Sequence, residues 1–190
     1  MKIKILIPIF NDWRSLSKLL QKIDQQIKSI NHEVSVLIVN DGSNEENEDE
    51  TYDFKNIKTI KVINMKVNKG HARCNAAGLK YIFEKEDFDY VIPMDGDGED
   101  RPEEINMLIE KSSEYPENVV TANRIKRSEG FVFKVCYELH KIFTYVFTGQ
   151  NIKFGNFSLL PKAVVEKMIN EKATWNSFSG SLSKISKNRK

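Results

Sequence analysis

Short apolar runs rich in β-branched residues alternate along the chain with segments in which apolar residues recur every three or four positions. The apolar runs cover residues 3–10, 34–39, 57–63, 88–94 and, more weakly, 117–122. Such runs are typical of strands in a parallel sheet that is buried on both faces. The helical spacing covers residues 13–30, 71–85 and 102–112. The alternation predicts an α/β fold with a mainly parallel sheet and helices on both faces.

The last third of the chain shows mainly helical patterns, at 131–148, 162–170 and 175–186. Further upstream, Asp100 and Glu103 have the spacing of a capping box, with Pro102 in the first turn, which predicts the helix start there. The sequence contains no internal repeat and no clear linker. We therefore expect one domain over residues 1–190.

Length and cysteine content agree with this expectation. A chain of 190 residues corresponds to one domain of ordinary size. The two cysteines, Cys74 and Cys136, are too few for a disulfide framework or a cysteine-type zinc site, so a reduced, cytoplasmic setting is expected. The first apolar run is short and ends at Pro8, which indicates a strand and not a signal peptide. The sequence contains no run of about 18 apolar residues, so it predicts no membrane-spanning helix.

Charge is unevenly distributed although the net value is only +2. Residues 1–130 carry 19 Lys and Arg against 24 Asp and Glu, a net charge of −5, and residues 131–190 carry a net charge of +7. The basic segment also contains the broad apolar pattern of residues 131–148. Two interpretations follow: an anionic partner such as a membrane surface for this segment, or an ordinary solvated surface over a core or dimer helix.

Acidic and amide residues follow three of the predicted strands. They are Asn11 and Asp12 after the first strand, residues 40–43 (Asn-Asp-Gly-Ser) after the second, and residues 95–100 (Asp-Gly-Asp-Gly-Glu-Asp) after the fourth. In open α/β sheets, ligands bind at the carboxyl ends of the strands. We therefore expect three acidic loops to meet at one edge, where their repulsion requires a cation or hydrogen-bond donors.

Asp95 and Asp97 stand two residues apart in a glycine-flanked loop, a pattern suited to a hard divalent ion. Oxygen ligands fit Mg²⁺ or Mn²⁺, with ligand phosphates completing the coordination. The alternative is a turn in which the aspartates bond their own backbone. An EF-hand is disfavoured, because Asn106 stands where the twelfth loop position requires Glu.

Residues 68–79 open the helix that follows the third strand. Lys69, His71 and Arg73 cluster at its N-terminus, where free amides and the helix dipole favour anions. The segment is not a Walker A loop, and no G-x-G-x-x-G follows the first strand. These absences argue against a P-loop NTPase and a dinucleotide-dependent dehydrogenase. Small residues in this helix, including Gly78, predict close packing on the sheet.

Four ordered motifs together resemble the family 2 glycosyltransferases of GT-A fold, in particular the polyprenyl-phosphate type that includes the dolichyl-phosphate mannosyltransferases. The motifs are IPIFND at 7–12, VNDGS at 39–43, NKGHARCNAAGL at 68–79 and MDGDGEDRPEEI at 94–105. Weaker matches are ANR at 122–124 and FGNFSLLPKAV at 154–164. The resemblance implies a nucleotide-sugar-binding part at 1–122 and an acceptor-side part at 123–190. Members of this type usually continue further, so the acceptor side is expected to be truncated or to lack that part.

The resemblance implies a role for each matching residue. Pro8, Phe10 and Asp12 would line the nucleotide-base pocket, and Asp41 would accept a hydrogen bond from the base. Lys69 and Arg73 would lie near the ribose or diphosphate, Asp95 would contact ribose or sugar, and Asp97 would hold the metal. Arg124 and Arg127 would act in catalysis by facing an anionic acceptor or the sugar-phosphate. Asp12 stands where Glu is commoner.

The implied activity is metal-dependent transfer from a UDP- or GDP-sugar, with UDP preferred, in cell-envelope glycan biosynthesis. A hydroxyl acceptor requires a general base, and residues 154–157 contain no acid. A polyprenyl phosphate is already ionised and requires cations. The alternatives are a soluble glycan acceptor, a nucleotidyltransferase and an inactive sugar-nucleotide-binding module. We expect no nucleic-acid partner and a cytoplasmic location, either free or at the inner face of the membrane.

Overall fold

The computed structural model describes residues 1–46, 53–122, 155–186 and 189–190. Within these ranges the strands are β1 (Lys2–Ile9), β2 (Glu33–Asn40), β3 (Ile60–Asn64), β4 (Tyr90–Pro93), β5 (Val120–Thr121) and β6 (Ser158–Pro161). The α-helices are α1 (Trp13–Gln26), α2 (His71–Lys85), α3 (Ile105–Glu114), α5 (Lys162–Asn170) and α6 (Phe178–Ile185). Short 3₁₀ helices are η1 (Ile27–Ser29), η2 (Pro102–Glu104) and η3 (Lys172–Trp175).

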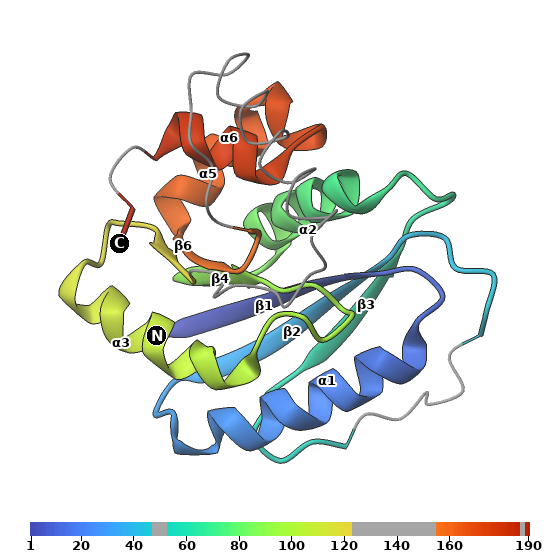
Figure 1. Cartoon of the computed structure of the whole chain (residues 1–190), viewed down its shortest axis with the longest axis horizontal. Coiled ribbons are helices and arrows are strands. Elements are labelled where there is room, and N and C mark those ends of the chain that lie inside the picture. Colours follow the sequence, from blue (N-terminus) through green and yellow to red (C-terminus); the bar gives the residue numbers. More distant parts are fainter. Residues whose placement is uncertain (47–52, 123–154, 187–188) are drawn as a thin grey trace, which may run out of the picture.

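The strands form one sheet in the order β3-β2-β1-β4-β6-β5 (Figure 1). β3, β2, β1 and β4 are parallel, whereas β6 runs antiparallel to both β4 and β5. The predicted mainly parallel α/β sheet is therefore confirmed. Strand β6 was not predicted, since residues 158–161 were expected only to precede a helix.

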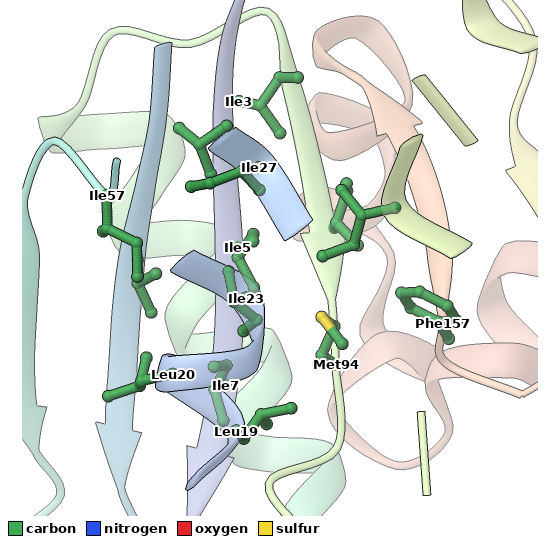
Figure 2. Packing of buried hydrophobic residues seen from close by; sticks show 14 of the residues in the cluster. Ile3, Ile5, Ile7, Leu19, Leu20, Ile23, Ile27, Ile57, Met94 and Phe157 are labelled. Carbon is green, nitrogen blue, oxygen red and sulfur yellow. The ribbon is translucent and has the colours of Figure 1, made fainter. Parts of the chain in front are cut away.

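Helices cover both faces of the sheet, as predicted: α1 and α3 lie on one face, and α2, α5 and α6 on the other (Figure 1). Alternate side chains of β1 explain this arrangement. Ile3, Ile5 and Ile7 join the cluster beneath α1, which Figure 2 shows, whereas Leu6 joins the cluster beneath α2. Both sets are buried, as a two-sided parallel sheet requires.

The predicted capping box at Asp100 is wrong. The segment begins with η2, whose N-terminal cap position is Arg101, and no side chain caps it. Asp100 instead accepts a hydrogen bond from the backbone N–H of Asp95 at 2.8 Å. The buried carboxylate of Asp100 therefore stabilises its own loop through this hydrogen bond.

The expected helix at 131–148 lies outside the described residues. In the part of the chain that the structure describes, no helix has the length and apolar character needed to cross a bilayer.

Candidate nucleotide-sugar site

β1, β2 and β4 run parallel and end at the same edge of the sheet, so the loops that follow them meet there. Two glycines mark where the loops touch. A Cβ atom on Gly96 would lie 3.1 Å from the carbonyl oxygen of Pro8, and one on Gly42 would lie 2.9 Å from the backbone nitrogen of Asn68. The predicted convergence of the three acidic loops is thus observed, with the loop before α2 packed against them.

Asn11 joins the first two loops. Its backbone N–H donates to Ser43 Oγ at 2.9 Å, and its Oδ1 accepts from the amides of Asn44 and Glu45. Asn11 has a φ of 59°, a left-handed conformation that asparagine tolerates. Trp13 Nε1 donates to the Glu45 carbonyl at 2.9 Å and adds a second link. Sequence reasoning placed Asn11 at this edge but did not identify its bonds to the second loop.

Asp41 holds the loop before α2. The residue is only 4 % exposed. Its carboxylate accepts hydrogen bonds from the backbone N–H groups of Lys69 at 2.7 Å and Gly70 at 2.8 Å. Gly70 then caps α2 with a φ of 87°. The donors that the acidic edge was expected to need are, at this position, backbone amides.

The buried thiol of Cys74 lies on the first turns of α2 beside Asp41. Burial, with a smaller contribution from the hydrogen bond to Asp41 and its charge, raises the pKa of this thiol to about 12. A thiol that stays protonated is a poor nucleophile and a poor metal ligand. Cys74 is therefore a structural residue of the site.

Asp95 is contacted from two directions. His71 Nε2 lies 2.9 Å from Asp95 Oδ1, and Asn156 Nδ2 donates to the same oxygen at 3.3 Å. His71 is the first residue of α2, and Asn156 comes just before β6. Residues 154–157 contain no acid in the sequence, but the fold brings Asp95 against Asn156.

The charge of His71 responds to this pairing. The hydrogen bond to Asp95 raises the pKa of His71 above its usual value of 6.5, burial opposes the change, and the charges of Asp95, Asp97 and Asp100 add to it. The imidazolium form is thereby favoured at the acidic edge. Sequence reasoning grouped His71 with Lys69 and Arg73 as an anion-binding cluster and did not predict the Asp95 pair.

Asp97 projects from the same loop as Asp95 and is exposed. Its Oδ1 accepts from the backbone N–H of Glu99 at 2.9 Å, in a turn that Gly98 completes with a φ of 80°. An exposed carboxylate suits Mg²⁺ or Mn²⁺. Among the described residues, no group of three or more His, Cys, Asp or Glu side chains is placed to hold a metal. The Asp97 carboxylate is an oxygen donor of the kind that Mg²⁺ or Mn²⁺ accepts beside water and phosphate oxygens.

The other predicted residues occupy the same edge with differing exposure. Asp12 caps α1, accepting from the Ser15 N–H at 3.2 Å. Phe10 is 49 % exposed beside the loops, whereas Pro8 is buried beneath Gly96. Lys69 and Arg73 are exposed at the start of α2. Arg124 and Arg127 lie outside the described residues.

Two solved structures share this fold. S. aureus TarS, residues 1–349, in complex with UDP-GlcNAc has a TM-score of 0.55 and 15 % identity, covering 87 % of this chain and 48 % of TarS. The mannosyltransferase PcManGT of Pyrobaculum calidifontis, in complex with GDP-Man and Mn²⁺, has a TM-score of 0.58 and 13 % identity, covering 87 % of this chain and 46 % of PcManGT. The fold is therefore the GT-A fold.

Sequence comparison gives the family. The model of glycosyl transferase family 2 matches residues 4–175, so the chain belongs to that family. An undecaprenyl-phosphate 4-deoxy-4-formamido-L-arabinose transferase of Proteus mirabilis is 26 % identical over 162 residues, 85 % of this chain and 48 % of the relative. An uncharacterised glycosyltransferase of Synechocystis sp. is 27 % identical over 169 residues, 86 % of this chain and 51 % of the relative. The chain spans about half the length of these curated relatives.

Proposed function

We propose that this chain is the catalytic domain of a glycosyltransferase that moves a sugar from a nucleotide-sugar, preferably a UDP-sugar, to an acceptor. The observation that carries the proposal is the convergence of Asp41, Asp95 and Asp97 at the carboxyl ends of β2 and β4, in a chain of this family. Support also comes from the relatives of known structure, which were solved with UDP-GlcNAc and with GDP-Man.

The donor would lie across the loops at the carboxyl ends of the strands, with its base at the loop after β1 and its ribose, diphosphate and sugar at the loops before α2 and after β4. Exposed Phe10 offers an aromatic face for the base, with Pro8 and Asp12 on the same loop. Asp41 would accept from the base while its loop bonds persist. Lys69 and Arg73 carry positive charge to the ribose or diphosphate, beside the free amides at the start of α2. Asp95 would orient the ribose or sugar.

Asp97 would hold Mg²⁺ or Mn²⁺ against the diphosphate. When bound, the ion neutralises the charge that develops on the leaving nucleotide diphosphate. The protein's own contribution is to fix the Asp97 loop through the Glu99 amide and to keep Asp95 hydrogen-bonded beside it. Asp95 then orients the donor while Asp97 holds the ion.

For the acceptor, we favour a polyprenyl phosphate, taken up by a protein that lies at the inner face of the membrane. One relative is named as an undecaprenyl-phosphate transferase. The carboxylate that Asn156 contacts is Asp95, which is already paired with His71 and is assigned to the donor. A phosphate oxygen is already ionised and requires no base. Arg124 and Arg127 are the cations we assign to it.

The donor proposal is tested by titrating UDP and GDP into the protein by calorimetry, with and without Mn²⁺. Wild type should bind one of them, and more tightly with Mn²⁺. Asp97→Asn should abolish the Mn²⁺-dependent gain without lowering the melting temperature, because the side chain is exposed and Asn can still accept from the Glu99 N–H. Asp87→Asn is the matched control and should retain the gain, because this exposed aspartate pairs with Lys2 at the start of β1, at the other end of the strands. Equal Mn²⁺ dependence in Asp97→Asn and wild type contradicts the metal assignment.

The acceptor proposal is tested by adding undecaprenyl phosphate and a soluble sugar acceptor separately to the same protein with donor. Transfer to the lipid phosphate, reduced by Arg124→Ala or Arg127→Ala, supports it. Transfer to the soluble acceptor alone overturns it.

A further inference from the structure

Oδ1 of Asp95 is the meeting point of the two parts of the chain. It contacts Nε2 of His71 at 2.9 Å, from the part assigned to the donor, and accepts from Nδ2 of Asn156 at 3.3 Å, from the part assigned to the acceptor. The Asp95 side chain is 19 % exposed and that of His71 is 47 % exposed. The carboxylate therefore faces the site from a largely enclosed position, and its partners lie at the rim.

The His71 ring lies against Asn75, one turn further along α2, whose Nδ2 is 3.4 Å from both ring nitrogens. Asn75 is fully buried, so it has little freedom to move. At the other end, Asn156 is followed by Phe157, which is buried in the cluster beneath α1, and by β6. Each donor to Asp95 thus lies next to a buried side chain.

We propose that His71 and Asn156 are positioning residues that together fix the orientation of Asp95 for the donor. The proposal rests on the proposed function, since it names how one of the donor-binding carboxylates is set. A carboxylate bonded from one side can rotate about its Cβ–Cγ bond. Donors from two different elements restrict that rotation, and restricting it before binding lowers the entropy cost of capturing the ligand.

A consequence is that the acceptor-side part of the chain influences donor affinity. Asn156 belongs to residues 123–190, yet it bonds the carboxylate that we assign to the ribose or sugar. A change at Asn156 should therefore alter nucleotide affinity although Asn156 itself does not contact the nucleotide.

The test uses the calorimetric Kd of UDP or GDP, whichever binds wild type, in the presence of Mn²⁺. His71→Phe, which keeps a planar ring but no N–H, should weaken binding by about fivefold to tenfold, the size of one lost hydrogen bond. His71→Gln, which retains an N–H donor, should recover most of that loss. Asn156→Ala should weaken binding by about threefold to tenfold. His32→Phe and Asn170→Ala, both away from the site, should match wild type.

A role through Asp95 is distinguished from direct contact by repeating the comparison in an Asp95→Ala background, with ligand-observed NMR to read weak affinities. There His71→Phe should change Kd by less than about twofold, because residues that act through one another are non-additive. An undiminished effect of His71→Phe in that background overturns the proposal, since His71 would then contact the ligand. Unchanged affinity of His71→Phe, or no recovery in His71→Gln, overturns it as well.

Failure of the proposed function has a different signature. If wild type binds neither UDP nor GDP with Mn²⁺, the donor proposal itself is wrong. If wild type binds a nucleotide and the His71 and Asn156 variants bind it with the same Kd, the donor proposal stands and the positioning proposal alone is wrong.

Discussion

Asp41 bonds to the backbone of its own chain. Its two carboxylate oxygens accept one backbone N–H each, from Lys69 and Gly70, and the residue is 4 % exposed. The resemblance assigned Asp41 to the base, and that role stays a prediction. The geometry adds that Asp41 fixes the loop which carries Lys69 and opens α2, so a change here alters the loop before it alters base selectivity.

Asp41→Asn should lower the free energy of unfolding by about 1–3 kcal/mol, because its NH₂ group would face one of the two backbone donors and leave it unpaired. Urea denaturation measures the loss. Asp12→Asn is the matched control, since Asn caps a helix as well as Asp does, and it should stay within about 0.5 kcal/mol. If Asp41→Asn is as stable as this control while its nucleotide preference changes, Asp41 reads the base and does not hold the loop.

The His71–Asp95 pair should respond to pH in a defined direction. The folded-state pKa of His71 is raised above 6.5, so the stabilisation from the pair is fully present below about pH 6.5 and is lost as the pH rises through the raised pKa. NMR titration of the His71 imidazole should therefore give a midpoint above 6.5. In Asp95→Asn the midpoint should fall, because the largest cause of the shift is removed. An unchanged midpoint in that variant contradicts the pairing.

At the scale of elements, α2 approaches the sheet through Gly78. A Cβ atom there would lie 2.3 Å from Leu6 Cδ1 and 3.0 Å from Val39 Cγ2. Residues on either side of Gly78 in α2 are also small or buried, as the sequence predicted. This close approach sets the distance between the sheet and the start of α2, and so places His71 beside Asp95.

Gly78→Ala should destabilise the protein by about 1–3 kcal/mol, even though Ala favours a helix over Gly by about 1 kcal/mol. The added methyl group forces Leu6 and Val39 to shift in a filled core. Thermal or urea unfolding measures the change, with exposed Lys80→Ala on the same helix as the control. Combining Gly78→Ala with Leu6→Val, which removes the nearest methyl, should cost less than the sum of the two single changes.

At the scale of the whole molecule, the spacing of apolar residues predicted the elements that local sequence determines. The parallel strands, α1 and α2 followed from apolar spacing, and the acidic edge followed from which residues succeed each strand. β6 could not be identified, because four residues such as Ser158–Pro161 carry too short a pattern. The meeting of His71, Asp95 and Asn156 was also beyond prediction, since it depends on packing between separate segments, of which those of Asp95 and Asn156 are 61 residues apart.

The insertion of β6 between β4 and β5 should make the described parts unfold together. β5 pairs with β6, and β6 with β4, so neither part completes its sheet alone. The chain has two tryptophans, Trp13 in the first part and Trp175 in the second. Each of the variants Trp13→Phe and Trp175→Phe keeps one tryptophan, which reports on one part. Within each variant, the urea transition measured by fluorescence should coincide with the transition measured by circular dichroism. Separated transitions within one variant contradict a single cooperative unit.

The position of β6 also bears on how the protein is made. β4 ends at Pro93, and its partner on the outer side begins at Ser158, about 65 residues later. At translation rates of about 5–20 residues per second, that edge of the sheet stays open for roughly 3–13 s on the ribosome. An unpaired edge with apolar residues beside it is a site for aggregation. The nascent chain therefore passes through an interval in which chaperones that shield strand edges would benefit its yield.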